Sequence, residues 1–266
     1  MERATVCINT SDRTDPLLVL LNSLFIQTNK DFDIIIVDDG KKNTLQPHDI
    51  ENFTKYFGIL GIGFSIHKNT LKLGLAKSRN VGIDLMKTNI GIFLDDDHIC
   101  DSRFVEFLMD SMKRKPDAGC VGAIFPHIES KIKFIKGPPP QMWGDLMRDK
   151  GWGDHQRWYY KFTPGTDDIF PAIALGGIVA FRKDPRIRKE ERLSFVSHTE
   201  DTLFALRYLE HGYKNYVNIR ALAYHRMVGD GGCRTFEDAD DQRNRDTAVF
   251  NEIMQELIPK LNLLPS

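Results

Sequence analysis

Two apolar segments, each followed directly by carboxylates, constrain the fold of this chain most strongly. Residues 33–37 read Asp-Ile-Ile-Ile-Val and lead into Asp38 and Asp39, and residues 90–94 read Ile-Gly-Ile-Phe-Leu and lead into Asp95–Asp97. Unbroken apolar runs are typical of strands buried on both faces, as in parallel sheets that helices cover on both sides. Adjacent carboxylates at the end of such a strand repel one another and are costly to desolvate, so they indicate a bound cation.

Strand and helix patterns alternate along the chain. Strands are expected at about 4–9, 33–37, 64–67, 90–94, 119–125, 172–181 and 216–224, and helices at about 14–24, 74–86, 102–114, 198–212 and 245–261. The alternation predicts an α/β fold with a Rossmann-like, mostly parallel central sheet flanked by helices. In such sheets the ligand crevice lies beyond the carboxyl ends of the strands, where residues 10–13, 38–40 and 95–97 would meet.

The composition bounds the function. The chain has 266 residues, enough for one large domain or two closely packed halves, and its formal net charge of −1 excludes the global basic field of nucleic-acid-binding proteins. Four scattered cysteines without Cys-x-x-Cys spacing argue against a zinc site or a disulfide framework. Neither a signal peptide nor a membrane-spanning apolar run is found, so we expect a cytoplasmic protein, with peripheral attachment to a membrane left open.

Residues 136–171 differ from the rest of the chain, because they are rich in proline and glycine and hold all three tryptophans. A loop of this length within a compact domain is usually functional or disordered. The tryptophans favour a binding lid over a simple linker.

The spacing Asp95-x-Asp97 at a strand end suits Mg²⁺ or Mn²⁺, which bind carboxylate oxygens and share their coordination shell with substrate phosphates. The alternative is an acidic turn that caps the following helix. His225, at the end of another expected strand, could complete the metal shell through a neutral imidazole. A lone histidine is more often a packed or surface residue, so this assignment stays open.

The pattern of buried strand, carboxylates and glycine also occurs at Asp38-Asp39-Gly40. Asp39 could accept a hydrogen bond from the N–H of a base such as uracil, and Asp12 and Arg13 at the neighbouring strand end could complete a base and phosphate pocket. The alternative is an Asx-type turn or a helix cap.

Two further motifs have equally plain alternatives. Lys77 and Arg79 lie near the start of an expected helix, where Arg79 could pair with a diphosphate or with Asp95, or the segment could form a solvated basic face. Glu200 and Asp201 lie in the first turn of a helix, where the macrodipole favours an ionised carboxylate. They could be capping residues, but if this helix end faces the crevice, Asp201 becomes a candidate general base.

The order of the motifs strongly resembles that of the family-two glycosyltransferases of the GT-A fold, over about residues 4–226. The motifs are Thr10-Ser11-Asp12, Val37-Asp38-Asp39-Gly40, Gly74-Leu-Ala-Lys-Ser-Arg79-Asn80-x-Gly82, Phe93-Leu94-Asp95-Asp96-Asp97, Gly176-Gly177 and Glu200-Asp201. The resemblance implies a nucleotide-sugar donor, usually UDP-linked, a Mn²⁺ or Mg²⁺ cofactor, and inversion at the anomeric carbon.

The resemblance also implies roles for individual residues. The donor nucleotide and sugar would be bound by Thr10, Ser11, Asp12, Arg13, Asp39, Lys77, Arg79, Asp95 and Asp96. Asp97 would be the main metal ligand, His225 a further ligand, and Asp201 the catalytic base. Gly176 and Gly177 would leave room for a sugar, and Glu200, Trp152 and Trp158 would contact the acceptor, since aromatic faces stack on the C–H surfaces of sugars.

Residues 1–266 are expected to form a single GT-A domain. Its first half, to about residue 125, would bind the nucleotide sugar, and its second half, about 126–266, would bind the acceptor under a lid at about 136–171. The acceptor would be a glycan, a lipid-linked molecule or a small molecule, and no nucleic acid is expected. The triple aspartate departs from the family pattern and leaves open how Asp95–Asp97 divide their work. The Gln-x-x-Arg-Trp pattern of the processive synthases is absent, so polymer extrusion is not expected.

Two other functions compete with this one. A metal-dependent phosphohydrolase would use a strand-end aspartate to attack phosphate, but the helix that begins at Glu200 and the tryptophan-rich segment would then have no role. A binding module without turnover is disfavoured because both Asp97 and Asp201 are present.

Overall fold

The computed structural model describes residues 2–126, 135–136, 161–162, 168–226 and 238–261. The strands are β1 (Ala4–Thr10), β2 (Phe32–Asp38), β3 (Phe64–Lys68), β4 (Ile90–Asp95), β5 (His98–Cys100), β6 (Ala118–Ile124), β7 (Ile135–Lys136), β8 (Lys161–Phe162), β9 (Ile169–Ala172), β10 (Val179–Arg182) and β11 (Lys214–His225). The helices are α1 (Thr14–Phe25), α2 (Pro47–Ile59), α3 (Leu75–Leu85), α4 (Phe104–Arg114), α6 (Glu200–Glu210) and α7 (Ala239–Lys260).

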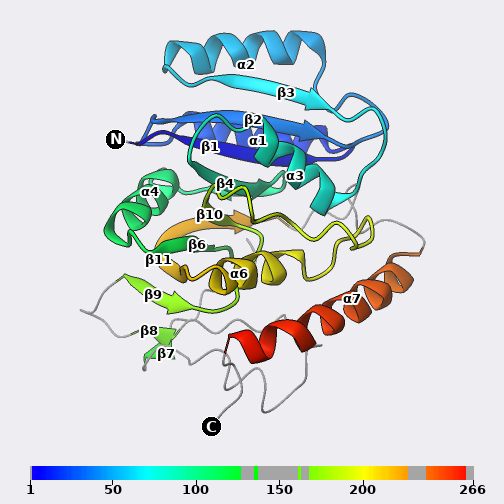
Figure 1. The fold of residues 1–266 in the computed structure, drawn as a ribbon. Coiled ribbons are helices and arrows are strands. Elements are labelled where there is room, and N and C mark those ends of the chain that lie inside the picture. The colour runs from blue at the N-terminus through cyan, green and yellow to red at the C-terminus, as the bar shows by residue number, and fades with distance from the viewer. Residues whose placement is uncertain (1, 127–134, 137–160, 163–167, 227–237, 262–266) are drawn as a thin grey trace.

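Within the described residues, nine strands form one sheet in the order β3-β2-β1-β4-β10-β6-β11-β5, with β9 also paired to β11 (Figure 1). The strands β1, β2, β3, β4, β6 and β11 run in one direction, whereas β5, β9 and β10 run against their neighbours. The prediction of a mostly parallel central sheet flanked by helices is therefore confirmed. The short strands β7 and β8 form a separate pair.

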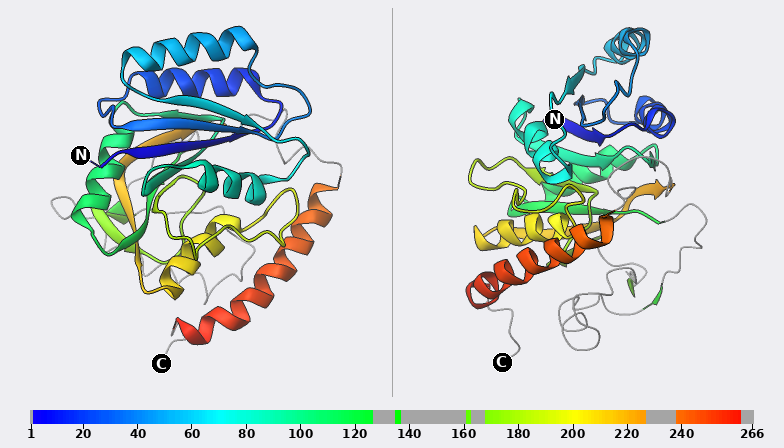
Figure 2. Two further views of the ribbon diagram at one scale, coloured as in Figure 1. Left: turned by 45° about the horizontal axis from the view of Figure 1, so that its top comes forward. Right: turned by 90° about the vertical axis from the view of Figure 1, so that its right-hand side faces the viewer.

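Apolar clusters lie on both faces of the sheet. One contains apolar side chains of α1 and α4 together with Phe57 of α2, and the other contains Ile83 of α3 with Phe204, Ala205 and Tyr208 of α6. Figure 2 shows α1 and α3 on opposite sides of the strands. Every residue of β1 is buried, as expected for a strand covered on both faces. Helix α7 packs outside α6 through a third cluster that includes Leu203, Leu206 and Phe250.

The strand register brings the predicted motifs to one edge of the sheet. Thr10 at the end of β1 pairs with Asp38 at the end of β2, and Asn9 pairs with Asp95 at the end of β4. The polar segments that follow these three strands therefore lie side by side, which confirms the expected meeting of residues 10–13, 38–40 and 95–97.

The prediction of one strand over 172–181 is wrong. Strands β9 and β10 flank residues 173–178, which leave the ladder although Ala174, Leu175 and Ile178 are buried. A buried strand and a buried turn can have the same apolar sequence pattern, so the sequence could not distinguish them here. The break has a consequence for the site, because β10 re-enters antiparallel between β4 and β6 with Val179 opposite Phe93.

Two helices also differ from expectation. Helix α2 was not predicted because, apart from Phe57, its residues are not fully buried, and its signals are Pro47 and a capping box between Gln46 and Asp49. The last helix begins at Ala239 rather than near residue 245. Thr14 is the first helical residue of α1, as expected, and its hydroxyl donates to the Thr44 carbonyl.

The predicted lid at 136–171 lies largely outside the described residues, and so do Trp152 and Trp158. Among the helices that are described, none combines the length and the apolar character that crossing a membrane would require.

Candidate active site

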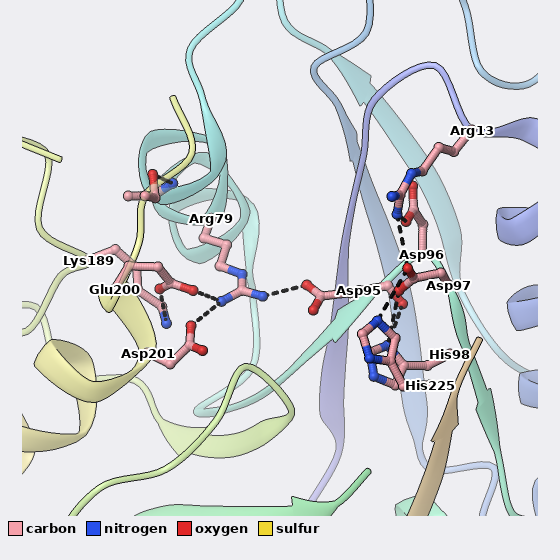
Figure 3. Close-up of polar contacts among 12 residues, drawn as sticks. Arg13, Arg79, Asp95, Asp96, Asp97, His98, Lys189, Glu200, Asp201 and His225 are labelled. Atoms are coloured by element: carbon pink, nitrogen blue, oxygen red, sulfur yellow. Dashed lines mark hydrogen bonds and ion pairs between the residues drawn. The ribbon is translucent and has the colours of Figure 1, made fainter. Parts of the chain in front are cut away.

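The three consecutive carboxylates at the end of β4, Asp95–Asp97, belong to two different groups of polar side chains (Figure 3). Asp95 pairs with Arg79, whereas Asp96 and Asp97 face Arg13 and two histidines. We call the first group the Arg79 cluster and the second the Asp97 cluster. The members are Arg79, Asp95, Lys189, Glu200 and Asp201 in the Arg79 cluster and Arg13, Asp96, Asp97, His98 and His225 in the Asp97 cluster.

Arg79 is the centre of the first cluster. Its guanidinium, carried on α3, is 1% exposed, and Nη2 lies 2.5 Å from Asp95 Oδ1. Nη1 contacts Oε1 of Glu200 and lies 3.1 Å from Oδ1 of Asp201. The solvated basic face offered as an alternative is therefore wrong for Arg79, which joins the end of β4 to the first turn of α6. The neighbouring Lys77 does point to solvent.

Lys189 is a second buried cation in the Arg79 cluster, and no motif in the sequence indicated it. Its Nζ lies 2.5 Å from Oε2 of Glu200, and its side chain is fully buried. The ammonium also lies over the rings of Phe93 and Phe204, at 5.0 and 4.3 Å from their centroids. Asn80, next to Arg79 on α3, bonds the backbone N–H and carbonyl of Lys189 and so fixes its position.

Burial and charge separate the protonation states of the two carboxyl groups on α6. Burial raises the pKa of Glu200 to about 8, although Arg79 and Lys189 oppose the shift. Burial would also raise the pKa of Asp201, but a hydrogen bond from Glu200 and the charges of Arg79 and Lys189 lower it. Glu200 therefore keeps a proton near neutral pH while Asp201 is ionised. The Asp201 side chain is 34% exposed, so this ionised carboxylate can reach a bound hydroxyl.

Gly177 lies beside Arg79, Asp95 and Asp201. A Cβ atom there would lie 3.2 Å from Arg79 Nη2, 3.4 Å from Asp95 Oδ2 and 3.5 Å from Asp201 Oδ2. A larger side chain would therefore fill the gap between Asp95 and Asp201. Gly176 has a different reason, since a Cβ there would overlap the ring of Phe125 at 2.4 Å. The structure brings Gly177 to the cluster and places Gly176 against the core.

The Asp97 cluster combines a carboxylate with two stacked imidazoles. Oδ2 of Asp97 lies 3.3 Å from Nε2 of His225 and 3.1 Å from Nη1 of Arg13, and Oδ1 lies 3.6 Å from Nδ1 of His98. His98 and His225 are cross-strand partners on β5 and β11, with ring centroids 4.6 Å apart. Burial would raise the pKa of Asp97, but the hydrogen bond and charge of His225, with His98 and Arg13, hold it below its ordinary range.

Asp96 accepts hydrogen bonds from two side chains at and after the end of β1. Thr10 Oγ1 donates to its Oδ2 at 2.7 Å, and Arg13 Nη1 donates to its Oδ1 at 3.0 Å. Burial raises the pKa of Asp96 to about 6 against the opposing effects of Arg13 and Thr10. Both oxygens of Asp96 therefore hold Arg13 and β1 in place.

The donor set of the Asp97 cluster fits a divalent cation. One ligand atom each from Asp97, His98 and His225 lies within 4.8 Å of the others. In the described part of the chain, Nε2 of the buried His98 has no hydrogen-bond partner. A mixed nitrogen and oxygen set suits Mn²⁺ better than Mg²⁺, which prefers oxygen ligands. His98 was not predicted as a ligand, although its place directly after three aspartates was a usable signal.

Asp39 binds the loop before α3. Its Oδ1 accepts from Leu73 N and from Asn69 Nδ2, both at 2.8 Å, and its Oδ2 accepts from Gly74 N at 2.9 Å. A carboxylate has about four acceptor positions, so one remains for a ligand. The turn alternative for this motif fits Asp38, which accepts from Gly40 N and Thr44 N.

The remaining predicted donor-binding residues surround the ends of β1 and β2. Asp12 has a left-handed φ of 58° and accepts from the N–H groups of Lys41 and Lys42, each at 3.1 Å. Ser11 lies 3.4 Å from Lys72 Nζ. Asp12 thereby ties the segment after β1 to the loop after β2.

The chain was compared with known proteins. Residues 5–185 match the family "Glycosyl transferase family 2". A curated relative, the glucosyl-dolichyl phosphate glucuronosyltransferase of Haloferax volcanii, is 25% identical over 152 residues, which cover 56% of this chain and 46% of the relative. The chain thus spans less than half the length of that protein.

Solved structures of S. aureus TarS share the fold. The structure of TarS 1–349 in complex with UDP-GlcNAc is 16% identical, with a TM-score of 0.64 over 95% of this chain and 66% of that one. Another structure of TarS 1–349 is 17% identical, with a TM-score of 0.60 over 84% of this chain and 60% of that one. At this identity the likeness supports the α/β architecture and leaves the ligands of this chain to be argued from its own residues.

Proposed function

Because this chain belongs to glycosyl transferase family 2, we propose that it transfers a sugar from a nucleoside-diphosphate donor, with UDP as the nucleotide, to an acceptor hydroxyl with inversion. The Arg79 cluster carries this proposal. One buried guanidinium holds the ionised Asp201 of α6 and Asp95 of the donor-side strand at the same time, with Gly177 leaving space between them. Arg79 would thereby hold the catalytic base, Asp201, at a fixed distance from the end of β4.

The donor would lie along the carboxyl edge of the sheet. Asp39, Asp12, Thr10 and Ser11 would contact the base and ribose, with Lys77, Arg79 and Arg13 nearer the phosphates. UDP is supported by the complexes of the structurally similar TarS with UDP-GlcNAc and with UDP. The relative from Haloferax volcanii is named as a glucuronosyltransferase, so UDP-glucuronate is a second donor to test.

A divalent cation, with Mn²⁺ preferred over Mg²⁺, would be held by Asp97 and His225, with His98 as a third ligand. When bound, it would neutralise the charge that develops on the departing diphosphate. Arg13 also contacts Asp97 and would lie near those phosphates.

The reaction follows from the position of Asp201. Its carboxylate takes the proton of the acceptor hydroxyl as that oxygen bonds to the anomeric carbon, and the bond from this carbon to the diphosphate oxygen breaks on the opposite face. UDP leaves with the bonding electron pair. Glu200, which keeps its own proton, holds Asp201 ionised, and Gly177 leaves space for the sugar.

The acceptor would be a glycan, a lipid-linked molecule or a small molecule, bound by the second half of a single domain formed by residues 1–266. Glu200 would act on the acceptor side through Asp201, since its own carboxyl group is buried against Arg79 and Lys189, and Trp152 and Trp158 would add stacking surfaces. A cytoplasmic enzyme attached peripherally to a membrane would reach a lipid-linked acceptor.

The test is a ligand screen followed by one substitution. UDP, UDP-GlcNAc, UDP-glucuronate and GDP are added with and without Mn²⁺, and we expect a UDP ligand with Mn²⁺ to raise the melting temperature most. Asp201→Asn should lower UDP release from the best donor at least ~100-fold while leaving donor affinity nearly unchanged. Asp240→Asn, at an exposed position of α7, is the matched control.

Two results would contradict the proposal. If no nucleotide stabilises the protein and phosphate is released from simple esters, the phosphohydrolase replaces it. If Asp201→Asn abolishes nucleotide binding together with turnover, Asp201 is not the base.

A further inference from the structure

The loop before α6 joins three helices at the site. It spans Ser194–Thr199 and contains two non-glycine residues with left-handed backbone, Ser197 at φ 52° and Thr199 at φ 70°. Residues other than glycine adopt this conformation only where the surroundings impose it. The contacts that impose it determine where α6 begins, and therefore where Glu200 and Asp201 lie.

Asp246 of α7 supplies the main contacts from outside the loop. Its Oδ1 accepts from Ser194 N at 2.6 Å, and its Oδ2 accepts from Ser194 Oγ at 2.8 Å and from His198 N at 2.7 Å. The residue is 1% exposed. One turn earlier on α7, the buried Gln242 accepts from Val196 N at 3.3 Å. Asp246 accepts three hydrogen bonds from the loop and Gln242 accepts one, so Asp246 is the principal anchor.

The same loop also holds the start of α3, which carries Arg79. Ser197 Oγ accepts from Ala76 N at 3.0 Å, and the Phe195 carbonyl accepts from Leu75 N at 3.3 Å. Gly74 lies against the Phe195 backbone, where a Cβ atom would be 2.7 Å from its Cα. The loop therefore sets α3 and α6 relative to each other, and with them the pairing of Arg79 with Glu200 and Asp201.

We propose that Asp246 is a positioning residue for the transfer reaction, which acts by fixing the loop 194–199 so that Asp201 faces the donor strand. The inference rests on the proposed role of Asp201 as the base. Asp246 lies more than fifty residues beyond the end of the family match at residue 185. Helix α7 thus positions Asp201 through the carboxylate of Asp246, in addition to packing on α6.

The test compares Asp246→Asn with Asp240→Asn on the same helix. Asn keeps the size of the side chain but replaces one acceptor oxygen by a donor, which then faces an N–H or hydroxyl of the loop. We expect kcat for UDP release from UDP-GlcNAc or UDP-glucuronate to fall about 10- to 100-fold, because small misplacement of a catalytic group has effects of this size. The KM for the donor should change less than kcat, since Asp246 does not contact the segment before α3, which keeps its own hydrogen bonds from Leu73 N and Gly74 N to Asp39. Ser194→Ala, a milder change, should lower kcat less.

Hydrogen exchange gives a second readout that does not depend on turnover. In Asp246→Asn, the amides of Ser194 and His198 and the first turn of α6 should exchange faster, with the central part of α7 still protected. Loss of protection throughout α7 would show that Asp246 only stabilises the helix, and would overturn the proposal. Unchanged kcat in Asp246→Asn, or a rise in donor KM without a fall in kcat, would overturn it as well.

The two proposals fail separately. If Asp201→Asn keeps full turnover, the base assignment is wrong whatever Asp246→Asn does. If Asp201→Asn loses turnover and Asp246→Asn does not, only the positioning role is wrong.

Discussion

The two clusters on either side of the triple aspartate compensate their charge in different ways. In the Arg79 cluster, Arg79 and Lys189 face three carboxyl groups, and the proton on Glu200 completes a balanced set. In the Asp97 cluster, Arg13 faces both Asp96 and Asp97, and burial lowers the pKa of His98 so that its imidazole stays neutral. Two carboxyl groups therefore share one guanidinium. The Arg79 cluster is balanced by side chains of the protein, whereas the Asp97 cluster has ligand atoms for an added cation.

Removal of Arg79 should have the largest effect. Arg79→Met removes one of the two cations, so that Lys189 is the one cation left among the three carboxyl groups of this cluster. We therefore expect a loss of about 3–5 kcal/mol in the free energy of unfolding, measured by urea denaturation. Lys77→Met, at an exposed position of the same helix, should change it by less than about 0.5 kcal/mol. Equal effects of the two substitutions would refute the buried, balanced cluster.

The proton on Glu200 predicts a pH dependence. Its folded pKa of about 8 lies above the unfolded value near 4.5, so the stability it contributes is complete below about pH 4.5 and is lost as pH rises toward 8. Its slope is at most about 1.4 kcal/mol per pH unit. Urea denaturation from pH 5 to 8 should show a shallower decline in Glu200→Gln than in the unchanged protein. An identical decline in both would mean that Glu200 is ionised throughout.

The Asp97 cluster should respond to added metal, and the Arg79 cluster should not. Mn²⁺ at about a hundredfold excess over its Kd should stabilise the protein by about 2.7 kcal/mol, and EDTA should reverse this. His225→Ala should weaken the response, whereas Asp201→Asn should retain it, both measured as thermal shifts against Mn²⁺ concentration. A full response in Asp97→Asn would place the ion elsewhere.

Much of the donor side could be predicted because its signals are local. A buried strand followed by carboxylates predicted the ends of β2 and β4, and the parallel register brought them together with Thr10. The role of Asp38 as a turn residue and of Asp39 as a loop anchor could not be separated in advance, since both follow the same strand. Helix α2 was missed because its buried surface is small.

The acceptor side was predicted less completely because its contacts join distant elements. Lys189 has no motif around it, and only the packing of its segment against Asn80 of α3 takes it to Glu200. Because a single strand was expected over 172–181, the turn that places Gly177 beside Asp95 was not predicted. Asp246 reads as one more acidic residue of an amphipathic helix until its loop partners are known.

By itself, the sequence determined which strands are buried, where they end in carboxylates, and that Arg79 and Asp201 lie near the starts of helices. The tertiary structure decided which charges meet: the antiparallel entry of β10 sets Gly177 at the cluster, and pairing of β5 with β11 stacks His98 on His225. The physical reason is that a carboxylate takes its protonation state from burial and from cations on other elements. One such partner of Asp201, Arg79, lies 122 residues away in sequence.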